Sequence, residues 1–122
     1  MSKITIVVAD LSADDALKIA ERVAENLRFS IDEQEKRADL RLRKGSLFLS
    51  IAFGAFILYV DFKLFVEETK RGDTRLMIEW SPPWWTGFLG ANRTRNSAKA
   101  LANELEFRFE KAGCEVVDRR DV

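Results

Sequence analysis

The sequence predicts one α+β domain, a two-layer sandwich in which two helices cover one face of an antiparallel sheet of five to six strands. Two segments carry apolar residues at helical spacing. Between them lie four consecutive segments with the alternation or the short apolar runs of strands, and a further strand-like segment stands near each end of the chain. The predicted order is therefore β-α-β-β-β-β-α-β, with both helices on the same side of the sheet.

The domain boundaries and the first two elements follow from length and spacing. A chain of 122 residues without a linker or repeat fits a single domain, residues 1–122. Ser12, followed by Asp15, has the spacing of a helix cap, and acidic residues suit the first turn of a helix. We predict a helix over residues 12–28. The apolar residues that define the first strand and this helix are Ile4, Ile6, Val8, Ala16, Ile19, Ala20, Val23 and Leu27.

The middle of the chain has the pattern of an antiparallel meander. A charged connection over residues 32–36 follows the first helix. The segment after it alternates apolar and charged residues, as a half-buried strand does. Short turns containing glycine separate it from the strand-like segments that follow. The four predicted strands are residues 38–43, 47–53, 56–67 and 74–80.

The last third of the chain holds the second helix. Pro82 and Pro83 cannot donate hydrogen bonds to a sheet, so they end the fourth strand of the meander. A helix is predicted over residues 94–112, with Gly113 as the residue that ends it. A short strand around Val116 follows. The apolar stripe of this helix is Ala98, Leu101, Ala102, Leu105, Phe109 and Ala112.

Composition narrows the chemistry. The chain has no His and one Cys, which removes the usual general base, Cys–His and Ser–His pairs and thiolate clusters. Lys plus Arg and Asp plus Glu both number 20, so no net charge attracts the chain to nucleic acid or an anionic membrane. The most apolar stretch, residues 47–60, is too short to cross a bilayer as a helix. We predict no catalytic residue, no metal, no cofactor and a cytoplasmic location.

The second face of the sheet is the first candidate site. Alternation places Tyr59 and Phe65 on the side away from the helices, with Met77 and Phe48 on the neighbouring strands. Scattered apolar residues on a solvated face would explain them without any function. A patch large enough to exclude water would instead mark an interface. The hypothesis for these four residues is a homodimer, the commonest oligomer of soluble proteins.

A cluster of aromatic residues is the second candidate. Trp80, Trp84, Trp85 and Phe88 fall within nine residues and include every Trp of the chain. Such side chains can fold back to seal one end of the core. They can also anchor a partner or form a wall beside a planar ligand. Both interpretations remain open at this point.

The residues after this cluster suggest an anion site. Arg93 and Arg95 stand where the second helix is predicted to start, and no acidic residue lies between residues 81 and 103. Cations at a helix N-terminus oppose the helix dipole, whereas an anion is favoured there. The hypothesis is a small anionic ligand held by the two arginines, Thr94 and Ser97, with Trp84 and Trp85 beside it. The alternative is that both arginines pair with acids elsewhere in the fold.

Three classes of function therefore stand. The favoured one is a non-enzymatic binding or assembly module that self-associates through the outer face of the sheet. The second is an anion-binding protein, or an enzyme that works without His, at the aromatic loop and the start of the second helix. The third is single-stranded nucleic acid binding by stacked aromatics and arginines, against which the balanced charge argues.

Overall fold

The computed structural model describes residues 2–32, 40–44, 60–81 and 87–121, and its helices and strands follow the predicted order. The elements along the chain are β1 (Ser2–Val8), α1 (Ala13–Asn26), β2 (Ser30–Asp32), β3 (Leu40–Lys44), β4 (Val60–Glu68), β5 (Thr74–Trp80), α3 (Gly87–Lys111) and β6 (Val116–Asp121).

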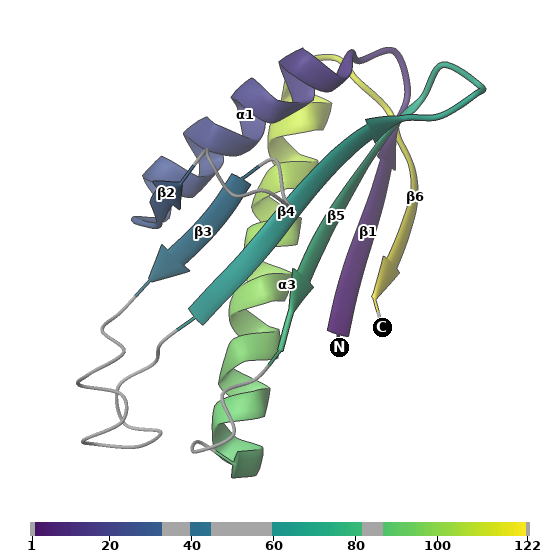
Figure 1. Ribbon diagram of the computed structural model, residues 1–122. Helices are drawn as coiled ribbons and strands as arrows, with labels where there is room; N and C mark the ends of the chain where they lie inside the picture. The colour runs from purple at the N-terminus through teal and green to yellow at the C-terminus, as the bar shows by residue number, and fades with distance from the viewer. Residues whose placement is uncertain (1, 33–39, 45–59, 82–86, 122) are drawn as a thin grey trace.

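The described strands form one antiparallel sheet of six strands in the order β2-β3-β4-β5-β1-β6. The first four follow one another among the described strands and form an antiparallel meander, and β1 lies between β5 and β6. The meander is not made of the four predicted segments: β2 was not predicted, and β3 pairs directly with β4, whereas the prediction placed a strand over residues 47–53 between them. Both helices pack against the same face of this sheet (Figure 1). The molecule is thus the two-layer α+β sandwich that the sequence predicts, and no described helix covers the other face of the sheet.

The first helix forms for the predicted reasons. The hydroxyl of Ser12 accepts a hydrogen bond from the backbone N–H of Asp15 at 3.2 Å, which satisfies one of the free donors of the first turn. Asp14 and Asp15 place negative charge at the positive end of the helix dipole. Arg28, with a φ of 66°, turns the chain away from the helical direction after α1 ends.

The second helix begins earlier than predicted. It starts at Gly87 rather than at residue 94, and it ends at Lys111 before Gly113, whose φ of 85° is the left-handed conformation expected there. Thr94 is 1% exposed and lies one turn before Ala98, so the buried side of α3 extends at least as far back as Thr94. Gly90 lies inside this helix, where a glycine costs about 1 kcal/mol relative to Ala, and burial of residues such as Thr94 can offset that cost.

The strands differ from prediction mainly at one edge of the sheet. Residues 30–32 form β2, although the charged connection was predicted to begin at Asp32 and no strand was predicted before it. Phe29 is buried and Ile31 packs against the core, and this anchors a short strand beside β3. The predicted strand over residues 47–53 lies outside the described residues, as does the start of the one predicted over residues 56–67.

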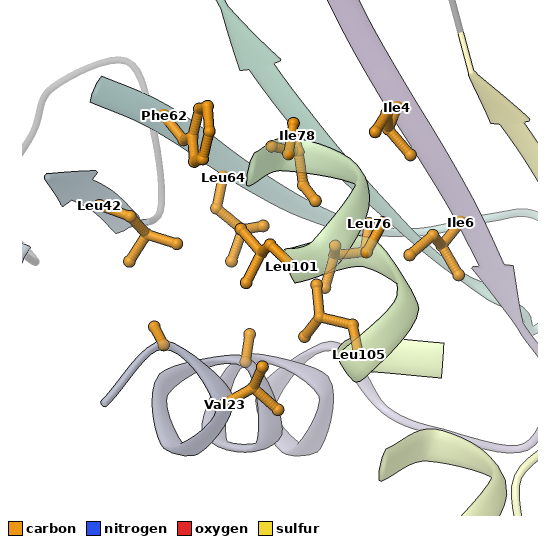
Figure 2. Packing of buried hydrophobic residues seen from close by; sticks show 14 of the residues in the cluster. Ile4, Ile6, Val23, Leu42, Phe62, Leu64, Leu76, Ile78, Leu101 and Leu105 are labelled. Atoms are coloured by element: carbon orange, nitrogen blue, oxygen red, sulfur yellow. The ribbon is translucent and has the colours of Figure 1, made fainter. Parts of the chain in front are cut away.

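The core lies between the helices and the inner face of the sheet. Figure 2 shows side chains of β1, β3, β4 and β5, such as Ile6 and Leu64, meeting those of α1 and α3. Burial alternates strictly along β1 and β5, and along the first part of β4, so one face of each strand supplies the core and the other does not. The largest fully buried side chains are Phe62, Phe109, Ile4, Ile6, Leu40, Leu42, Leu64, Leu76, Ile78, Leu101, Leu105 and Val8.

Candidate functional site

The outer face of the sheet carries an apolar pair at its centre. Phe65 of β4 stands directly opposite Met77 of β5, and Met77 is in turn opposite Thr5 of β1. All three side chains are half-buried, and no helix among the described residues covers them. Two of the four residues predicted for this face, Phe65 and Met77, therefore lie side by side on it. The other two, Phe48 and Tyr59, fall outside the described residues.

Four charged residues surround this pair in an alternating arrangement. On one side, Lys63 of β4 is opposite Glu79 of β5, and on the other side Glu67 is opposite Arg75. Arg75 Nη1 and Glu67 Oε1 form an ion pair at 2.8 Å, with both side chains about half exposed. Each strand thus carries one charge of each sign, two residues before and two residues after its central apolar residue. The signs on β5 are the reverse of those directly across on β4. We call these six residues the outer-face cluster.

An ion pair between Arg41 and Asp61 lies beside the cluster on the β3 side of the outer face. Arg41 of β3 is opposite Lys63, a like-charge contact that would be unfavourable alone. Arg41 turns instead toward Asp61, to which it donates two hydrogen bonds, at 3.0 Å from Nε and 2.6 Å from Nη2. A planar, two-pronged contact of this kind fixes the guanidinium better than a single bond does. The cluster is therefore bordered by ion pairs on its β3 side.

A shallow hollow adjoins the cluster on its other side. Its volume is about 450 Å³, and its floor is formed by Thr5, Val7 and Met77. Three cations and one acid surround that floor. They are Lys3, Arg75, Arg120 and Asp118. A concave, partly apolar surface next to the Phe65–Met77 pair can receive side chains of a partner.

Both edges of the sheet are built in ways that hinder strand addition. The edge strand β2 has only three residues. The other edge strand, β6, carries four charged residues in a row, and charges on an edge disfavour pairing with another chain. Arg120 Nε lies 3.2 Å from Asp118 Oδ2 on the outer side of β6. Both described edge strands therefore disfavour the addition of another strand.

The inner side of β6 is fixed to α3 by Arg119. Its guanidinium donates hydrogen bonds to Asp121, at 2.9 and 3.1 Å, and to Asn103, and it lies 3.4 Å from Glu106. The hydrogen bond to Asp121 raises the pKa of Arg119, and the charges of Asp121 and Glu106 act in the same direction against the effect of desolvation. The group is a structural cation that joins the edge strand to the helix.

The predicted anion site does not have the proposed geometry. Its backbone donors were the N–H groups around Thr94 to Ser97, expected to be free at a helix start, but these residues lie inside α3. Arg93 and Arg95 are two residues apart on a helix, about 200° around its axis, so they point to different sides. Thr94 is buried, and Trp84 and Trp85 fall outside the described residues.

One arginine of that prediction does line a cavity. Arg95 and Lys99, one turn apart on α3, border a space of about 180 Å³ together with Ile4, Trp80 and Asp121. Trp80 is 4% exposed and packs edge-on against Phe62, at 5.8 Å between ring centroids, so this Trp belongs to the core. Lys99 was not among the predicted site residues. The sequence signal for Lys99 was its position four residues after Arg95, which puts both residues on the same side of a helix.

Other kinds of site find no support in the part of the chain that the structure describes. No group of His, Cys, Asp and Glu side chains there could hold a metal ion. Among the described helices, none combines the length and the apolar character needed to cross a membrane. Comparison with protein families, with curated proteins and with solved structures finds no match for this chain.

Proposed function

We propose that this protein is a non-enzymatic assembly module whose copies self-associate, two at a time, through the outer face of the sheet. The single observation that carries the proposal is the outer-face cluster, in which an apolar pair is surrounded by charges of alternating sign. We expect the dimer to act in the cytoplasm. The chain has a single Cys and so no intrachain disulfide, as is usual for cytoplasmic proteins.

The alternating charges make the cluster complementary to itself. In one arrangement the partner's strands run in the reverse direction, and Lys63 lies over the partner's Glu67 while Glu79 lies over the partner's Arg75. Phe65 then meets the partner's Phe65. A two-fold axis makes each of these ion pairs twice. Complementary charge of this kind fixes the orientation of two partners and excludes others.

A second arrangement is equally complementary. If β4 lies over the partner's β5, Lys63 faces the partner's Glu79 and Glu67 faces the partner's Arg75. Phe65 then meets the partner's Met77. Sheets that pack face to face keep their strands roughly aligned, which both arrangements satisfy. A ligand of a single charge sign would leave half of these four charges opposed, so a second copy suits the cluster better.

The basic test is the oligomeric state. We expect sedimentation equilibrium at micromolar concentration to show a reversible monomer–dimer equilibrium. Phe65→Ser removes the apolar centre and should weaken the dimer at least tenfold, or about 1.4 kcal/mol. Lys63→Glu should weaken it too, because the new carboxylate faces an acid in both arrangements. Lys18→Glu, which makes the same charge change on the exposed side of α1, should leave it unchanged. A wild-type chain that stays monomeric throughout rules the proposal out.

Paired charge reversals distinguish the two arrangements. Lys63→Glu combined with Glu67→Lys should restore the dimer if the strands run in reverse. Lys63→Glu combined with Glu79→Lys should restore it if β4 lies over the partner's β5. Each double variant restores one arrangement and adds repulsion to the other. Thermal unfolding of the dilute proteins controls for changes within one chain. If neither double variant associates better than Lys63→Glu alone, these charges do not form the interface.

A further inference from the structure

We propose that the cavity between α3 and the sheet binds a small oxyanion, held by Arg95 and Lys99. The cavity lies where Ile4 of β1 pairs with Asp121 of β6, next to Trp80 at the end of β5. Its volume of about 180 Å³ is below the ~300–1,000 Å³ of pockets for larger organic ligands. It is on the helical side of the sheet, so it is independent of the outer-face cluster.

The two cations at this cavity lack a counter-ion within the described part of the chain. Arg95 and Lys99 are exposed, and neither makes an ion pair with a described residue. Their spacing of four residues puts them on the same side of α3, and like charges at this spacing destabilise a helix by roughly 0.2–0.5 kcal/mol. The arrangement becomes favourable when an anion lies between them.

The acid that lines the cavity is already engaged. Both carboxylate oxygens of Asp121 accept hydrogen bonds from Arg119, at 2.9 and 3.1 Å. That guanidinium, which also lies 3.4 Å from Glu106, offsets part of the charge of Asp121, and Arg95 and Lys99 remain as the donors available to a ligand. The other walls, Ile4 and Trp80, are apolar and almost fully buried. Because Arg95 and Lys99 are exposed, water screens part of their attraction for an anion, and binding should weaken as salt is added.

The ligand is therefore a small phosphate or carboxylate group. Both present several oxygens that can accept charge-assisted hydrogen bonds from a guanidinium and an ammonium at once. Inorganic phosphate tests the charge alone, and benzoate tests whether a ring beside Trp80 adds affinity. A saturable response to either one supports the site.

The experiment is a titration of the full chain with each anion, followed by ¹⁵N–¹H NMR. We expect the Trp80 indole and the backbone amides around residues 95–99 to shift together and to saturate. Arg95→Gln combined with Lys99→Gln should weaken this binding at least tenfold. Without ligand, this variant should melt at the same temperature as the wild type or slightly higher, because the like-charge contact is gone.

A matched control is available on the other helix. Lys18 and Arg22 are also exposed and four residues apart, on α1, away from this cavity. Lys18→Gln combined with Arg22→Gln should bind like the wild type. Arg93→Gln should also bind like the wild type, because Arg93 is on another side of α3. Equal weakening in all three variants would mean that only overall charge is sensed, and no saturable shift with either anion would mean that the site does not exist.

Discussion

The two faces of the sheet differ in role: one packs against the helices, and the other carries the outer-face cluster. On β4 and β5, Leu64 and Ile78 face the helices and are 0% exposed, while the adjacent Phe65 and Met77 face outward and are half-buried. The inner row is apolar except at the start of β5, where Thr74 is buried and its hydroxyl donates a hydrogen bond to the carbonyl of Leu11. The outer rows combine the apolar pair with ion pairs such as Glu67–Arg75. A single step along the strand therefore separates a residue that holds the fold from one that is free to make contact.

This contrast predicts which substitutions should change the stability of the monomer and which should change association. Inner-face residues contact both helices, so their loss leaves a cavity in a closed environment. On the outer face no described helix covers the side chains, which are half-buried or exposed, so solvent can fill the space that they leave. Variants of the inner face should change the stability of the monomer, whereas variants of the outer face should change association. Comparing adjacent positions on one strand tests this directly.

The largest effect is expected at Leu64. Leu64→Ala should lower the free energy of unfolding by about 2–5 kcal/mol, because the side chain is fully buried between the sheet and the helices. Phe65→Ala, one residue away, should lower it by about 1 kcal/mol or less, since that side chain is only half-buried and removes less apolar area from water. Urea denaturation of dilute protein measures both values. Equal losses at the two positions would mean that the outer face is also part of the monomer's core.

Most of the fold could be predicted because local signals agreed with the tertiary structure. The Ser12 cap and the spacing of Ala16, Ala20 and Val23 predict α1, and the alternation around Leu76 and Ile78 predicts β5. The strand β2 could not be predicted in this way. It has one apolar residue, Ile31, and it exists because Phe29 enters the core and holds the chain beside β3.

The candidate site was predicted only in part. Period-two alternation is enough to put Phe65 and Met77 on the outer face. That they stand directly opposite each other depends on strand register, which the turn between β4 and β5 sets. In that turn the N–H of Thr69 donates to the carbonyl of Asp73 at 2.7 Å, and Gly72 has a φ of 84°. The anion site was wrong in its donors because α3 starts at Gly87, so the N–H groups of residues 94–97 lie inside the helix. Thr94 is buried there on the same side as Ala98, a placement that its residue type alone does not reveal.

The edge strand β6 shows the same contrast between its two faces. Arg119 faces α3 and contacts Asp121, Asn103 and Glu106, whereas its neighbour Arg120 faces outward and pairs with Asp118. Arg119→Gln should lower the free energy of unfolding by about 1–2 kcal/mol, because partly shielded hydrogen bonds between charged groups are lost. Arg120→Gln should lower it by less than about 0.5 kcal/mol, since the Arg120 side chain is 78% exposed and such pairs are screened by water.

Thermal or urea unfolding checks both β6 variants. Hydrogen exchange adds a local readout, because the loss of Arg119 should speed exchange of the β6 amides more than that of the β4 amides. If Arg120→Gln proved the more damaging change, the contact between β6 and α3 would not be what holds this edge in place.

The smallest effect is expected for the cross-strand pair Lys63–Glu79 within one chain. The two residues are opposite each other on exposed strand faces, where opposite charges stabilise a sheet by roughly 0.2–1 kcal/mol. A double-mutant cycle with Lys63→Gln and Glu79→Gln on dilute monomer should give a coupling in the lower half of this range, and it should fall as salt is added. The same cycle on the free energy of dimerisation reports only contacts made between chains, because the coupling within each chain cancels between monomer and dimer. It should give a favourable coupling if β4 lies over the partner's β5, since Lys63 then pairs with the partner's Glu79. With reversed strands, Lys63 and Glu79 have different partners, and the coupling should be close to zero. An unfavourable coupling would mean that the interface pulls the two side chains of each chain apart, which neither arrangement of the outer-face cluster permits.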